Sequence, residues 1–168
     1  MATSFEDLRV LRAAETVADE VWRRVVKWDE FTRDVVGKQL TRAVDSIGAN
    51  IAEAYGRFHY GEKIQFLYYA RGSLFETKYW LNRVLVRELL PSDEVQRVAA
   101  QLTDIARQLN AFAGSLKSQR RSGEGMAVGM RESSAEYSVS MLDDDSTVLF
   151  SDDDLTRLEA TSSIALNL

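Results

Sequence analysis

The stretch QLTRAVDSIGANIAEAYGR, residues 39–57, carries two lines of side chains that define its secondary structure. One line is apolar and recurs at steps of three, four and seven, the period of an α-helix with one buried face. Its members are Leu40, Val44, Ile47, Ile51 and Phe58. The other line is polar, keeps the same period and lies opposite: Gln39, Arg42, Ser46, Asn50, Glu53 and Arg57. The pattern predicts an amphipathic helix that begins between Thr32 and Val36 and ends near Phe58.

Three more helical patterns lie on either side of this one. Before it, an apolar stripe predicts a helix from Ser4, a good N-cap residue, to about Trp28. After it, the spacing predicts a helix over about residues 61–90 and a fourth that starts at Pro91. Because the connections are short, neighbouring helices should run antiparallel. The predicted fold class is all-α, with an up-down-up-down four-helix bundle in residues 1–121.

The third helix differs from the others because it is apolar on more than one side. One stripe consists of Leu67, Leu74, Leu81 and Leu85. A second stripe lies about 100° around the helix, and two further aromatic side chains occupy a third direction. A helix of this kind is buried on several sides, and in a small bundle the second side is most simply covered by another subunit. The predicted oligomer interface comprises Ile64, Tyr68, Phe75, Tyr79, Val86, Tyr69 and Trp80.

The polar line of the second helix has two interpretations. It is either a solvated face with an Arg/Glu pair, or a subunit contact or ligand face. Serine and asparagine are indifferent helix formers, so a purely solvated face gains little from them. The basic residues on and near this line are candidates for phosphate contacts with nucleic acid. They are Arg42, Arg57 and Arg71, with Arg33 and Lys38 nearby.

The composition excludes several classes of chemistry. The chain has no cysteine and one histidine, His59, so disulfides, thiolate metal sites and multi-histidine metal centres are excluded. Residues 56–63 lack the Lys-Ser/Thr pair and the preceding strand of a phosphate loop. No nucleophile, base or metal set can be assembled, so we expect no enzyme and no cofactor. No apolar run approaches the length of a membrane span and the N-terminus lacks a signal-peptide pattern, so we expect a cytoplasmic protein without a membrane partner.

Four segments together resemble a known family. They are residues 39–43 (QLTRA), 46–57 (SIGANIAEAYGR), 5–8 (FEDL) and 70–76 (ARGSLFE). Over about residues 5–118 the chain is similar to the four-helix-bundle proteins encoded in intervening sequences of bacterial 23S rRNA genes. The accessory variability determinant of diversity-generating retroelements looks like a relative of this family.

The resemblance implies an up-down four-helix bundle that assembles as a barrel-like homopentamer. It also implies nucleic-acid binding, because the retroelement relatives bind nucleic acid and the reverse transcriptase through a strongly basic surface. Positions that match the family pattern, of interest but not as catalytic groups, are Arg42, Asn50, Glu53, Arg57 and Arg71.

The last 47 residues differ in composition from the rest. Residues 1–121 hold 19 bases and 16 acids, net +3, whereas residues 122–168 hold 2 and 10, net −8. We place the domain boundary near residue 121. The acidic segment is either a disordered, solubilising tail or a segment that docks into a protein partner, with residues 142–168 as the binding region. Its candidate contacts are Val148, Leu149, Phe150, Asp152, Asp153, Asp154, Leu155 and Leu158.

Two functions from different classes follow. The first is a homo-oligomeric accessory protein that binds RNA or DNA through arginine-bearing helix faces; its binding should depend steeply on salt. The second is an oligomeric scaffold whose acidic and apolar tail recruits a protein partner. The modest charge of residues 1–121 argues against the first, and the lack of an identifiable partner argues against the second.

Overall fold

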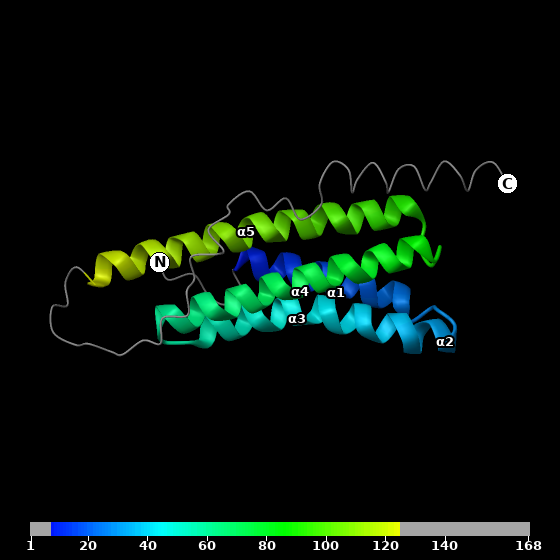
Figure 1. Cartoon of the computed structure of the whole chain (residues 1–168), viewed down its shortest axis with the longest axis horizontal. Helices are drawn as coiled ribbons and strands as arrows, with labels where there is room; N and C mark the ends of the chain where they lie inside the picture. Colours follow the sequence, from blue (N-terminus) through cyan, green and yellow to red (C-terminus); the bar gives the residue numbers. More distant parts are fainter. Residues whose placement is uncertain (1–7, 125–168) are drawn as a thin grey trace.

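The computed structural model describes residues 8–124, and within that range the chain is built from helices and turns (Figure 1). The elements in chain order are α1 (Arg9–Val25), α2 (Glu30–Thr32), the π-helical turn η2 (Arg33–Gly37), α3 (Lys38–Gly56), α4 (Tyr60–Val86) and α5 (Ser92–Glu124). No helix in the described range is long and apolar enough to cross a membrane.

The four long helices form the predicted bundle. Helix α1 packs on α3, α3 on α4, α4 on α5, and α5 closes the ring against α1. Successive long helices run in opposite directions, as the colours of Figure 1 show, which confirms the up-down-up-down order. The apolar stripes meet in one core, as amphipathic helices require. Its largest fully buried side chains are Leu40, Ile47, Ile51, Leu67, Leu74, Leu81, Leu102, Ile105, Val17 and Val44.

The start of the bundle differs from the prediction. Helix α1 begins at Arg9, with Leu8 in the N-cap position, whereas Ser4 lies outside the described residues. The helix therefore begins next to its first buried residues, Val10 and Leu11, and the capping role predicted for Ser4 stays a prediction.

The second predicted helix begins earlier than its apolar stripe indicates. Asp29 caps a helical turn, because its side-chain Oδ1 accepts a hydrogen bond from the backbone N–H of Thr32 at 3.0 Å. From there α2, η2 and α3 continue as one helical segment. A π-helical turn holds one extra residue, and such turns shift the register of the side chains that follow. No pattern in the sequence predicted it.

Gly37, at the end of η2, allows α3 to approach α1 closely. A Cβ atom at this position would lie 2.6 Å from Cγ1 of Val25 and 3.5 Å from the ring of Trp28. Both Val36 and Gly37 are buried, so this end of the α1–α3 contact is tightly packed.

Helix α4 ends at Val86, four residues before the predicted end. Glu88 follows in the left-handed conformation, with φ of 55°. The N–H of Leu89 donates to the carbonyl of Val84 at 3.0 Å, and the N–H of Glu88 donates to Leu85 at 2.9 Å. These two bonds form a Schellman cap, in which the αL position is more often glycine. The carbonyl of Pro91 then accepts the first bonds of α5, from Glu94 and Val95 at 3.1 Å each.

Helix α5 continues to Glu124, so residues 122–124 of the predicted tail are helical. The remainder of that tail, including all of its candidate contact residues, lies outside the described residues. In Figure 1 the C-terminal end of α5 extends past the ends of α1 and α3.

A polar contact joins α1 to α5 on the surface. Arg97 donates from Nε at 2.9 Å and from Nη2 at 2.6 Å to one oxygen of Glu20, and Gln101 donates to the other at 3.2 Å. Burial raises the pKa of Glu20, but these hydrogen bonds outweigh it and hold the pKa below its ordinary value. Glu20 and Arg97 are 77 residues apart along the chain, so local sequence spacing could not predict this contact.

Candidate functional site

The polar line of α3 lies along the seam between α3 and α4. At its N-terminal end, Nη2 of Arg42 donates to Oε1 of Gln39 at 2.8 Å and lies 3.9 Å from a carboxylate oxygen of Glu76 on α4. The guanidinium side chain is still 71% exposed. The charge of Arg42 is therefore partly balanced from the neighbouring helix.

The middle of the line is a ladder of hydrogen bonds, of which one, from Asn50 to Ser73, joins the two helices. Nδ2 of Asn50 donates to the carbonyl of Ser46 at 2.8 Å and to Oγ of Ser73 at 3.4 Å. Oγ of Ser73 donates to the carbonyl of Tyr69 at 3.1 Å, and Oγ1 of Thr77 donates to the carbonyl of Ser73 at 2.8 Å. Because Ser73 and Thr77 are buried, these bonds satisfy groups that would otherwise be costly to bury. Asn50 has a structural role here.

The C-terminal end of the line is held by Arg57. Its guanidinium forms an ion pair with Glu53, one turn earlier, and lies 4.7 Å from the ring centroid of Phe66 on α4. A cation over an aromatic face is attracted by the ring quadrupole. Glu53 and Arg57 are thus engaged with each other, and Arg57 also contacts α4.

The outward side of α4 exposes an apolar stripe. Its members Phe75, Tyr79 and Val86 are exposed by 41%, 55% and 65%, and Tyr69, about 100° around the helix from them, is exposed by 50%. Two of the rings carry arginines of their own helix, with Arg71 5.8 Å from the centroid of Phe75 and Arg83 5.7 Å from that of Tyr79. Tyr68, Gly72, Phe75, Tyr79, Asn82 and Val86 follow steps of four and three, the spacing of a coiled-coil seam.

Three residues of the predicted oligomer interface pack against the core of the bundle instead of lying fully on its outer surface. Ile64 is buried in the bundle's own core and offers no surface to a second chain. Tyr68 and Trp80 are half-buried and pack against the same core. The surface that remains for a second chain consists of Tyr69, Phe75, Tyr79 and Val86.

The basic candidates do not form one patch. Lys38 pairs with Asp34 at 3.0 Å and lies with Arg33 and Arg42 at the start of α3. Arg57 lies fifteen residues further along the same helix, roughly 22 Å away at 1.5 Å per residue. Arg71 is about 200° around α4 from Ser73, the residue that faces α3. The structure therefore separates the five basic residues into three locations.

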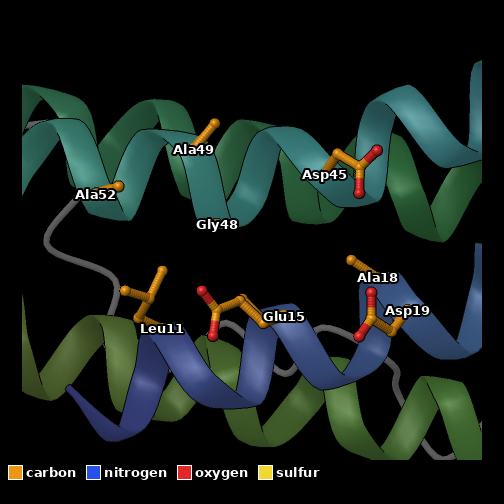
Figure 2. A pocket seen from close by; sticks show the side chains of 9 residues that line it. Leu11, Glu15, Ala18, Asp19, Asp45, Gly48, Ala49 and Ala52 are labelled. Carbon is orange, nitrogen blue, oxygen red and sulfur yellow. The ribbon is translucent and has the colours of Figure 1, made fainter. Parts of the chain in front are cut away.

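A shallow groove of about 290 Å³ lies on the other side of α3, against α1. Its floor consists of small residues, Ala14 and Ala18 from α1 with Gly48, Ala49 and Ala52 from α3. Figure 2 shows three carboxylates along it: Glu15 and Asp19 from α1 and Asp45 from α3. Burial, and then the charge of Asp19, raise the pKa of Asp45 above its ordinary value. The groove contains no base or nucleophile partnered for catalysis, and no described residues gather as a metal site.

Comparison with known protein families finds a match that covers most of the bundle. The profile of the 23S rRNA-intervening sequence proteins matches residues 6–111, almost two thirds of the chain. The chain belongs to the 23S rRNA-intervening sequence protein family. Among curated proteins, no significant match is found.

The family match confirms the resemblance stated from the sequence and locates the site within it. The intervening-sequence match covers α1 to α4 completely, with the whole polar line of α3 and the exposed stripe of α4, and ends inside α5. The last turns of α5 and the acidic segment after residue 121 lie beyond it. Any function of that segment is therefore separate from what the family match supports.

Proposed function

We propose that this intervening-sequence family member is a non-enzymatic, homo-oligomeric accessory protein that assembles through the outward face of α4. The observation that carries the proposal is the row of exposed apolar side chains on α4 formed by Phe75, Tyr79 and Val86, with the exposed Tyr69 beside it, about 100° around the helix. Contiguous apolar stripes on a soluble protein mark interaction sites. The resemblance implies five copies in a ring, and five is the number that we propose.

The chemistry of the stripe supports a protein contact. Tyrosine and arginine are enriched where protein interfaces contribute most to affinity. Arg71 and Arg83 already lie over the rings of Phe75 and Tyr79. Because these side chains are partly ordered before association, the entropy that they lose on binding is small. Gly72 lies in the same row with open space above it, so a partner helix can approach the backbone of α4 closely.

The test is the mass of the native particle. We expect the wild-type chain to sediment as an oligomer and the double variant Phe75→Ala, Tyr79→Ala to sediment as a smaller species. Trp22→Ala is the matched control, because Trp22 is a large exposed residue on α1, away from the stripe. Circular dichroism checks that both variants stay folded. A wild-type monomer at tens of micromolar, or an assembled double variant, would contradict the proposal.

Nucleic-acid binding is a second candidate, favoured by the charge at one end of the bundle. Residues 23–42 hold six bases and three acids, net +3, which equals the net charge of residues 1–121. Lys38 and Arg42 remain about 70% exposed, and Arg33 projects from η2. A ring of five copies would present five such basic ends, and multivalency strengthens weak contacts.

Binding of RNA and DNA at low and moderate salt tests this candidate. If the basic end contacts phosphates, Arg33→Ala with Arg42→Ala should weaken binding and reduce its salt dependence. Arg57→Ala is the control, because Arg57 lies at the other end of α3 and is paired with Glu53. Absence of binding at low salt would exclude the candidate and leave the scaffold alternative, in which the acidic tail recruits a protein.

A further inference from the structure

The turn between α3 and α4 exposes an aromatic cluster that nothing in the assembly proposal uses. Residues 57–59 connect the two helices, and Phe58 at their centre is 95% exposed, more than any other large apolar side chain among the described residues. Tyr55 and Tyr60, on either side, are also exposed. We call Tyr55, Phe58 and Tyr60 the turn cluster. Covering a phenylalanine side chain that is exposed to this degree removes a large apolar surface from water, which is favourable in free energy.

Cations surround the turn cluster. Arg57 and Lys63 follow Tyr55 and Tyr60 within three residues, and the guanidinium of Arg120 lies 4.0 Å from the position of a Cβ on Gly61. Lys117, one turn earlier on α5, is 5.9 Å from the ring centroid of Tyr68. The acids nearby in the sequence are Glu53 and Glu62. Arg57 and Glu53 pair with each other, and the remaining charges are three cations and one acid, so this end of the bundle suits a ligand that is both apolar and acidic.

The chain itself contains such a ligand. Residues 143–158, DDDSTVLFSDDDLTRL, hold six aspartates and one arginine around the apolar residues Val148, Leu149, Phe150, Leu155 and Leu158. Acidic residues interspersed with apolar anchors are suited to a groove or patch that is aromatic and basic.

The C-terminal end of α5, from which the chain continues toward this segment, lies near the turn cluster. Because Arg120 lies against Gly61, the helix passes the cluster and ends one turn later, at Glu124. Figure 1 shows the C-terminal end of α5 and the α3–α4 turn at the same end of the bundle. Residues 125–147 then provide a tether of 23 residues, whose root-mean-square span is about 26 Å for a flexible chain. A tether of that length gives an effective local concentration near millimolar.

We propose that residues 148–158 dock in cis on the turn cluster, with Phe150 and its neighbouring leucines covering Phe58 and the aspartates facing Arg57, Lys63 and Arg120. The assignment is independent of the proposed assembly, because the outward stripe of α4 and the turn cluster contain different residues. The proposal assigns a binding site to residues 148–158, which lie outside the family match.

Trypsin cleavage of the complete chain tests the proposal. Beyond residue 124 the sequence offers trypsin only Arg131, in the tether, and Arg157, in the docking segment. Docking should slow cleavage at Arg157, and Phe58→Ala should accelerate it at least tenfold while cleavage at Arg131 stays unchanged. Phe31→Ala is the matched control, because Phe31 is exposed to 76% at the opposite end of the bundle. Equal rates at Arg157 in the wild type and Phe58→Ala would overturn the proposal.

A cysteine pair distinguishes docking in cis from docking on another copy. The natural chain has no cysteine, so His59→Cys with Ser151→Cys introduces one pair. Mild oxidation should form an intrachain disulfide, seen as a monomer of altered mobility on a denaturing gel. Glu30→Cys with Ser151→Cys, at the opposite end, should not react. Disulfide-linked dimers from the first pair would assign the segment to a second copy, and equal reaction of both pairs would indicate no docking; either result overturns the proposal.

Discussion

Helix α3 has two sides that pack in contrasting ways. Toward α4 its polar residues are hydrogen-bonded or ion-paired, and the seam is closed by Asn50, Ser73 and Arg57. Toward α1 the helix meets its neighbour tightly at Gly37 but loosely at Gly48, where a Cβ would still be 3.9 Å from Ala14 and Leu11. The α1 side therefore ends in an acidic groove lined by small residues. The contrast shows that helices with equally clear apolar stripes need not pack equally well.

The largest expected effect is at the tight end of the α1 side. Gly37→Ala places a Cβ 2.6 Å from Cγ1 of Val25, a buried, β-branched side chain with little rotamer freedom. Overpacking costs about 1–3 kcal/mol, more than alanine gains in helix propensity. Urea unfolding should show a lower midpoint. An unchanged midpoint would mean that the helices separate easily at this end and that the contact is not tight.

The same substitution at the open end should have the opposite sign. Gly48→Ala adds a methyl group at ordinary contact distance from α1 and removes a glycine from a helix interior. We expect stabilisation by about 0.5–1 kcal/mol. The two glycine variants, measured side by side in urea, control for each other. Destabilisation by Gly48→Ala would show that α1 lies closer to α3 than the groove indicates.

Removal of the ladder on the α4 side should cost less. Asn50→Ala loses the donor to Ser46 and Ser73 but gains helix propensity, so a net loss of about 0.5–1 kcal/mol is expected. Ala49→Ser, next to it on the open side, is a control for a polar change without the ladder. Thermal unfolding measures both. A loss no larger for Asn50→Ala than for the control would mean that the ladder contributes nothing.

The smallest effect should come from charge in the groove. The pKa of Asp45 is raised, so the folded state holds a proton on this carboxyl more readily than the unfolded chain does. At neutral pH the ionised form therefore destabilises the fold, and Asp45→Asn should stabilise it by a few tenths of a kcal/mol, since the side chain is exposed to water. The gain should disappear as the pH falls and the wild-type carboxyl becomes protonated. A gain that persists in acid would refute the electrostatic cause.

Periodicity predicted most of this fold because burial of apolar stripes is the dominant force in a bundle. Leu40, Val44, Ile47 and Ile51 are buried as expected, and the long helices lie in the predicted order. The last residue predicted in this stripe, Phe58, is exposed instead, because α3 ends at Gly56. The end of α4 was predicted four residues too late because Glu88 adopts the left-handed conformation that ends the helix. This position is usually occupied by glycine, and a glutamate gives no such sign in the sequence. The π-helical turn was not predicted because the 3.6-residue period of an apolar stripe does not signal the extra residue that such a turn holds.

The candidate site was predicted in composition but not in arrangement. The polar line from Gln39 to Arg57 is present, and its Arg/Glu pair is seen between Arg57 and Glu53. Asn50 contacts α4 of the same chain, which neither interpretation predicted, and a subunit contact or ligand face stays a prediction. The basic residues were predicted as one set, yet the helix geometry separates Arg42, Arg57 and Arg71. Partners such as Glu76 for Arg42 come from another helix, so sequence spacing could not identify them.

The sequence by itself determined which side chains must leave water, and hence four antiparallel helices and the family to which they belong. It also determined that α4 is apolar on more than one side. Tertiary structure decided which of those side chains stay outside: Ile64 enters the core while Phe75 and Tyr79 remain exposed. The physical reason is that periodicity fixes directions within one helix, whereas exposure and charge pairing depend on the distance and tilt of its neighbours.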